Sequence, residues 1–376
     1  MKGSVFAKTL PKTAGAKREQ MIFDAVRRRD IAPIEWVPIT TSTTSGDGRT
    51  YTATIKVSKD ALRIGDAKDS FRATVNHRTA QHIADELGVV LPTPYLSDQI
   101  WKQAQVRPSS LSQAHKSWVD DGTMSHTRRM IEQSQLVDKL VAKEQERTSK
   151  TGLIADVGKD WVTTKRLWEP YDPPARCEKG HPRAANYGWH LKQKWLYTAA
   201  SDPATYVLQP VGLCHTIPHT DYSQVVRLVR RDVNVCGPGL GDTGCMVIDI
   251  RSIAGGHTLS PLVSHTGVLS AMRHPDVPPS CEDGKRCAKD AGEEQSGNGM
   301  GQNGNPPVDL GPISCPIDCE KLPPPGPDPT YGVEPYDTRQ AGMSAANKVM
   351  LVGAGAVVGY FALKWLLPSL SSRAAR

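Results

Sequence analysis

The feature that most constrains this chain is an uncharged apolar segment close to its C-terminus. Residues 349–363 contain no charged side chain, and apolar residues continue past Lys364 to Leu370. About 22 such residues, at a helical rise of 1.5 Å each, are enough to cross a hydrocarbon core of roughly 30 Å. We therefore expect a single transmembrane helix over residues 345–370, a short basic tail over residues 371–376, and a lipid bilayer as a partner.

Two glycines in this segment suggest how it could associate with a second helix. Gly355 and Gly359 form a GxxxG step, which allows close contact between helices, so a homodimer through this face is one expectation. Basic residues stand both before and after the segment, and their distribution therefore leaves its orientation in the membrane open.

The sequence before this segment is too biased in composition to fold into a core. Residues 290–307 are rich in Gly, Asn, Glu and Gln, and residues 322–328 read LPPPGPD. Such sequences bury too little apolar surface to offset the entropy lost on ordering. We expect residues 278–344 to form a disordered stalk, partly flexible and partly an extended spacer.

The N-terminal residues 1–30 are rich in Lys and Arg and lack the continuous apolar run of a secretory signal. We expect them to form a basic flexible arm. Residues 31–277 are then left as one soluble domain, which is large enough to bury a substantial core without help from metals or disulfides.

Within this domain, apolar periodicity changes along the chain. Residues 51–57 alternate and are rich in β-branched side chains, which predicts a strand. Residues 80–87 carry apolar side chains at helical spacing and are followed by Gly88, which predicts a helix and its C-terminal cap. Ser97 is predicted to be the N-cap of a short helix, and residues 125–146 form the longest helix candidate.

After Lys150 the pattern returns to short strands, predicted at residues 153–157, 161–163, 206–208, 225–229 and 246–250, with loops rich in Gly, Pro and His between them. Strands, then helices, then strands again favour an α+β fold with a largely antiparallel sheet.

The chain carries a formal net charge of +7 and has a pI of about 8.9. A mildly basic surface suits anionic lipid, nucleic acid or an acidic cell-wall polymer. The sequence has no zinc-finger spacing, basic zipper or aromatic-basic RNA signature, which argues against nucleic acid. It also has no Walker A loop, no dinucleotide fingerprint directly after a predicted strand, and no HExxH or GxSxG motif. These absences argue against the common NTPases, nicotinamide dehydrogenases, zincins and α/β-hydrolases.

The cysteines allow two interpretations. None forms a CxxC pair, so a zinc ribbon is not expected. Their even number and close pairs suit disulfides in an oxidising compartment, whereas a cytosolic protein would keep them as reduced thiols. Both interpretations stay open for all eight: Cys177, Cys214, Cys236, Cys245, Cys281, Cys287, Cys315 and Cys319.

Histidines concentrate in the second half of the domain, and two short segments there are candidates for chemistry. One ends in His190, and the other contains His215, His219 and Asp221. Pro218 lies between His215 and His219, so these two are not a helical HxxxH pair and would meet only if the loop folds back. Three histidines, or two with a carboxylate, could bind zinc or another divalent metal and leave a position open for hydrolysis.

A metal-free site is the alternative. His215 would act as base, Asp221 would orient it, and Ser223 or Cys214 would be the nucleophile. Tyr222 and Arg227 would shape the pocket in either case. A third interpretation is that these are loop histidines bonded to backbone, with Trp189 and Tyr222 as core aromatics.

Several phrases, spread in order over about residues 20–275, resemble an uncharacterised bacterial protein family: TAQHIADELG, LPTPYLSDQIW, GKDWV, ANYGWH, QPVGLCH and HTDYSQVVRLVRRDV. Some members have DYSH where this chain has DYSQ, so Gln224 stands where an additional histidine can occur. The resemblance names no reaction, but it implies that His190, His215 and Asp221 belong to one site.

The leading functional expectation is a membrane-anchored, hydrolase-like protein of a bacterial cell envelope or a phage. It would act on cell-wall polymer, because a stalk holds the domain away from the membrane and a basic surface suits an acidic polymer. The alternative is a non-enzymatic, tail-anchored structural or binding protein of an envelope or virion. The metal content of the purified domain would distinguish the hydrolase hypothesis from the non-enzymatic one.

Overall fold

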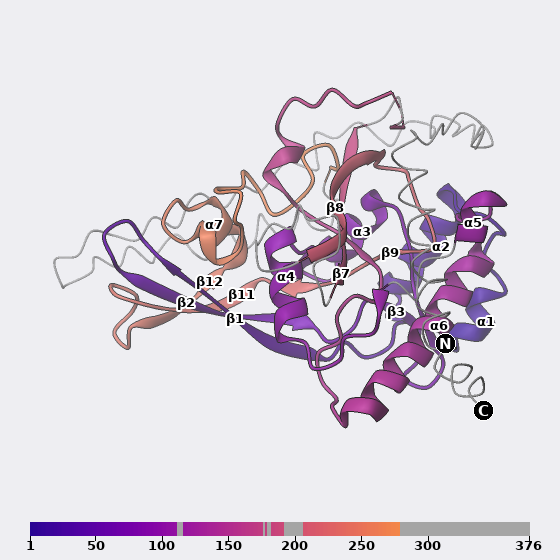
Figure 1. Cartoon of the computed structure of the whole chain (residues 1–376), viewed down its shortest axis with the longest axis horizontal. Helices are drawn as coiled ribbons and strands as arrows, with labels where there is room; N and C mark the ends of the chain where they lie inside the picture. The colour runs from indigo at the N-terminus through magenta and orange to yellow at the C-terminus, as the bar shows by residue number, and fades with distance from the viewer. Residues whose placement is uncertain (111–115, 176, 179–181, 192–205, 279–376) are drawn as a thin grey trace, which may run out of the picture. The chain divides into compact units, whose positions relative to one another are not determined.

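The computed structural model describes residues 1–110, 116–175, 177–178, 182–191 and 206–278 (Figure 1). The predicted stalk, transmembrane segment and basic tail lie outside these residues, as do Gly355, Gly359 and the last four cysteines. No helix in the described part of the chain has the length and apolarity needed to cross a bilayer. The described residues form an α+β fold with mostly antiparallel sheets and few helices, as the sequence predicts.

The largest sheet has six strands, in the order β12-β11-β2-β10-β5, with β1 on the other side of β2. Every pair in it is antiparallel. The strands are β1 (Trp36–Thr44), β2 (Thr50–Ser58), β5 (Val89–Val90), β10 (Val229–Arg230), β11 (Asp232–Cys236) and β12 (Cys245–Asp249). The predicted strand at 51–57 is confirmed, because side chains of β2 alternate between buried and exposed.

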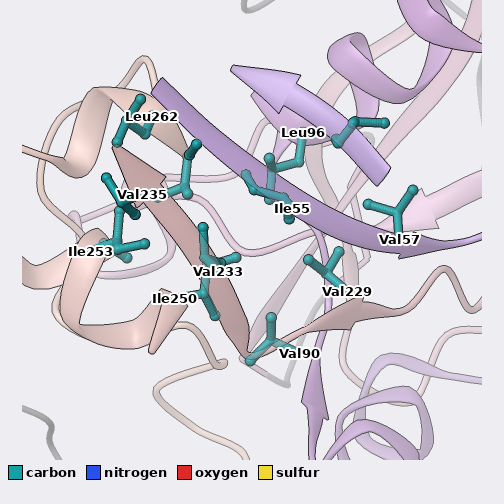
Figure 2. Close-up of a cluster of buried hydrophobic side chains, with 14 of the residues drawn as sticks. Ile55, Val57, Val90, Leu96, Val229, Val233, Val235, Ile250, Ile253 and Leu262 are labelled. Carbon is teal, nitrogen blue, oxygen red and sulfur yellow. The ribbon is translucent and has the colours of Figure 1, made fainter. Parts of the chain in front are cut away.

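One face of this sheet carries the main core. Ile55 and Val57 from β2 pack with Val233 and Val235 from β11 and with residues of α4 and α7 (Figure 2). The helices are α4 (Pro94–Gln103) and α7 (Ile250–Gly255).

A second sheet, of four strands in the order β8-β7-β6-β9, positions the functional side chains. Its strands are β6 (Lys159–Trp161), β7 (Arg183–Leu191), β8 (Tyr206–Thr216) and β9 (Gln224–Val225). β7 pairs antiparallel with β6 and β8, and β6 pairs parallel with β9. His190 and His215, expected in loops, therefore lie on paired strands, whereas His219 and Asp221 lie in the turn and loop that follow β8.

The remaining elements are α1 (Gly3–Ala7), α2 (Ala16–Arg27), β3 (Arg63–Gly65), β4 (Ser70–Arg72), α3 (His77–Glu86), α5 (Lys116–Asp120), α6 (Thr127–Thr148) and 3-10 turns at Lys165–Leu167 and Ser260–Leu262. α3 and α6 confirm the two longer predicted helices. Gly88 follows α3 with φ +65, the left-handed conformation expected of a C-terminal cap. Residues 153–157 form no strand; Ile154 makes only an isolated bridge to Val106.

Two local predictions are wrong. Residues 1–30 are not a flexible arm, because Ile22, Ala25 and Val26 lie fully buried on one face of α2. Their spacing of three and four residues forms an apolar stripe that the basic composition conceals. Ser97 is not an N-cap but lies inside α4, which begins after Thr93, whose hydroxyl accepts a hydrogen bond from the Leu96 amide.

Candidate metal centre

Two histidines meet where β8 ends. His215 is the penultimate residue of β8, and a tight turn follows, closed by the His219 amide bonding to the Thr216 carbonyl at 3.0 Å. This turn folds the chain back, which is the condition under which the two histidines were expected to meet. The two imidazole rings stack with their centroids 3.7 Å apart and their planes 18° from parallel.

A disulfide brings a carboxylate to this pair. Cys177 is bonded to Cys214, the residue before His215, so the next residue, Glu178, lies beside the histidines. Its amide donates to the Cys214 carbonyl at 3.1 Å. One carboxylate oxygen accepts hydrogen bonds from the amide and hydroxyl of Thr216, each at 2.8 Å. The disulfide also excludes Cys214 as a nucleophile.

The other oxygen of Glu178 is the point on which both histidines converge. The Nδ1 atom of His215 lies 3.3 Å from it, and Nδ1 of His219 contacts the same oxygen more closely. One potential ligand atom from each of the three residues lies within 4.8 Å of the others. Two imidazoles and one carboxylate are a donor set typical of a catalytic zinc site, which has three protein ligands and one position left open.

The three side chains are only partly covered, with exposed fractions of 22% for Glu178, 26% for His215 and 19% for His219. Solvent can therefore reach one side of the cluster. The residues fit a divalent transition metal in both chemistry and accessibility.

The electrostatics of the cluster are strongly coupled. Burial lowers the pKa of His215 to about 4, aided by the charge of His219. Burial disfavours the charged form of His219 as well, but Asp221 and Glu178 outweigh it and raise its pKa to about 9. Burial favours neutral Glu178, yet the two histidines hold its pKa well below the usual range. Near neutral pH, His215 is therefore neutral and His219 is protonated, and a metal ion would displace the protons that face Glu178.

Asp221 lies behind this cluster rather than in it. Its Oδ2 atom is 3.8 Å from Nε2 of His219, whereas the predicted orientation of His215 by Asp221 is not found. The hydroxyl of Ser223, the predicted nucleophile, donates to Oδ1 of Asp221 at 2.6 Å, and no histidine of the described residues is its hydrogen-bond partner. Burial opposes ionisation of Asp221, but Lys159 and His219 hold its pKa well below the usual value. The Asp-x-Ser spacing makes this local bond, as in an Asx turn.

His190, predicted to share the site, belongs to a different group of side chains. Its Nδ1 and Nε2 atoms lie 2.8 Å from carboxylate oxygens of Asp156 and Asp98. Burial lowers the pKa of His190, but Asp156 and Asp98 outweigh burial and raise it to about 9. Both ring nitrogens are therefore occupied, and neither is available to the metal cluster.

The strand geometry explains this separation. On β7, Ala184 pairs with His215, whereas His190 pairs with Val207 at the other end of β8. Six residues of strand amount to on the order of 15–20 Å. In addition, Trp189 has φ +57, a left-handed conformation that interrupts the alternation of side chains just before His190.

Arg227 and Tyr222 were predicted to shape the pocket, but the structure gives them other contacts. Arg227 is buried and donates to the carbonyls of Ser58 and Ile154 at 2.8 and 2.9 Å, so it holds backbone segments together. Tyr222 packs edge-on against Trp118, with ring centroids 5.0 Å apart. Tyr222 and Trp189 are thus buried aromatics, as the third interpretation of the sequence had it.

Glu178 is the ligand candidate that sequence reasoning missed. The available signal was its position directly after a cysteine, with another cysteine directly before His215. Pairing those two cysteines is what brings Glu178 to the histidines. Comparison of the chain with protein-family models, curated proteins and solved structures found no match.

Proposed function

We propose that this chain binds a divalent transition metal, most simply zinc, through Glu178, His215 and His219, and uses it for hydrolysis. The observation that carries the proposal is the convergence of two Nδ1 atoms on one carboxylate oxygen at a partly exposed position. Such a metal, when bound with an open position, lowers the pKa of a coordinated water and polarises the bond to be cleaved.

The proposed substrate class is an acidic cell-wall polymer of a bacterial envelope, reached from a membrane anchor at residues 345–370. The support is the basic balance of the chain, +7 overall, together with a cationic side chain close to the cluster. Arg183 donates to the Cys214 carbonyl at 3.4 Å, which places its cationic group near the cluster. A cation near the metal would favour a negatively charged substrate.

The test is turnover by the full chain on purified cell-wall polymer, after loading with zinc and again after stripping with a chelator. We expect release of soluble fragments only in the loaded state, and none above background for His215→Ala or Glu178→Gln. His257→Ala changes an exposed histidine outside the cluster and should keep full turnover. Bound zinc without turnover would instead favour the alternative, a non-enzymatic protein that uses metal to hold its fold or bind a partner.

A further inference from the structure

We propose that Asp221 is a positioning residue for the metal site: it holds the outer nitrogen of His219, so that His219 coordinates through Nδ1. This inference rests on the proposed metal function and goes beyond it by assigning the ligand atom and the residue that fixes it.

The geometry around His219 separates its two ring nitrogens. Nδ1 points to Glu178, where the ligand atoms converge. Nε2 points the other way, is buried without a hydrogen-bond partner among the described residues, and lies 3.8 Å from Oδ2 of Asp221. A neutral imidazole that coordinates a metal through one nitrogen carries its proton on the other, and a carboxylate that accepts this proton fixes the ring. A movement of roughly 1 Å would bring this pair to hydrogen-bonding distance.

Asp221 is itself held in place for that role. Its Oδ1 accepts hydrogen bonds from the amide and hydroxyl of Ser223 at 2.7 and 2.6 Å. Its Oδ2 accepts from the side-chain amide of Gln224 and from Nζ of Lys159, both at 3.1 Å. These four donors, one of which is the Lys159 ammonium group, keep this carboxylate ionised and immobile. Asp221 and Ser223 were predicted to supply a metal ligand and a nucleophile. In this assignment they instead position one ligand, His219.

The first test compares zinc affinity of full-length Asp221→Asn with that of the wild-type chain, using zinc ion alone as the probe. Loss of an outer-sphere carboxylate typically weakens metal binding by about 10–100-fold. We expect that weakening for Asp221→Asn.

The matched control is Asp156→Asn, which removes a carboxylate from another buried histidine, His190, outside the metal cluster. Asp156 has φ +53, a conformation that asparagine tolerates. Its zinc affinity should equal that of wild type. A purely structural role for Asp221 would lower unfolding stability and leave zinc affinity unchanged, and that result would overturn the inference. If the wild-type chain binds no zinc, the proposed metal function fails instead.

A second measurement needs no variant at Asp221, and so it stands even if Asp221→Asn does not fold. Nitrogen-15 spectra of the wild-type chain labelled at histidine report which ring nitrogen of His219 binds zinc and which carries hydrogen. We expect zinc on Nδ1 and a slowly exchanging proton on Nε2. Zinc on Nε2, or a rapidly exchanging Nε2 proton, would contradict the assignment. Ser223→Ala, which removes one donor to Asp221, should weaken zinc binding less than Asp221→Asn does.

Discussion

Removing the Cys177–Cys214 disulfide should weaken zinc binding as well as lower the stability of the fold. The bond joins residues 37 apart in the sequence and places Glu178 beside His215. A loop of that length gives a chain-entropy contribution of about 4 kcal/mol to stability. The variant Cys177→Ser/Cys214→Ser should lose roughly that much, and serine avoids creating thiolates that could themselves bind metal.

The effect on the metal site follows from the freedom that Glu178 would gain. Without the disulfide, its backbone must be ordered each time a metal binds, at a cost of roughly 1–2 kcal/mol per residue. We therefore expect the zinc Kd to rise about 5- to 30-fold. The measurement is a competition titration against a fluorescent chelator, below any unfolding transition.

The chain offers a matched control in its second disulfide. Cys236–Cys245 joins residues only 9 apart, at the β11–β12 pair. Its removal should cost about 2.5 kcal/mol by the same loop argument and leave the zinc Kd unchanged. If both double variants bind zinc as tightly as wild type, or both lose affinity equally, the Cys177–Cys214 disulfide does not organise this site.

Two further predictions concern the fold. The pKa of His190 is raised to about 9, so its stabilising charge is present below the unfolded value of about 6.5 and is lost as pH rises towards 9. In urea denaturation between pH 6.5 and 9, this residue should make stability fall by up to about 1.4 kcal/mol per pH unit, and His190→Gln should reduce the slope by that amount. A profile that His190→Gln leaves unchanged would count against a charged His190. Ile22→Ala in α2 should lower the free energy of unfolding by about 2–5 kcal/mol, because the side chain is fully buried. A loss below about 0.5 kcal/mol would instead support the flexible N-terminal arm expected from composition.

The parts of the fold that the sequence predicted are those with a clear local period. Residues 51–57 alternate between apolar and polar side chains, and β2 follows that alternation. Residues 80–87 repeat at helical spacing and form α3. In both elements, the spacing of apolar residues within a short stretch of sequence determines which face is buried, so no long-range information is needed.

The strand β7 was missed, and β8 was predicted only over residues 206–208, because their sequences do not alternate simply. Gly188 and Trp189 have positive φ, and the pairing register shifts on both sides of Asn186. Pro210 and Gly212 within β8 are also typical of loops. Pairing with a neighbouring strand, which lies outside any local window, decides the structure here.

The candidate site was half predictable. The sequence indicated that His215 and His219 would meet if the chain turned back, and they do. It could not supply Glu178, because disulfide connectivity is not determined by sequence alone. The sequence also grouped His190 with His215 and His219. The register of β7 instead places the His190 ring against Asp98 and Asp156.

The measurement that tests the central claim most directly is the metal content of the purified full chain. It would be prepared without a metal-affinity tag, equilibrated with zinc, dialysed and analysed by mass spectrometry. We expect about one equivalent of zinc per chain, lost in Glu178→Gln and His215→Ala and retained in His190→Gln. A folded wild-type chain without bound metal, or zinc that depends on His190 as much as on Glu178, would contradict the site described here.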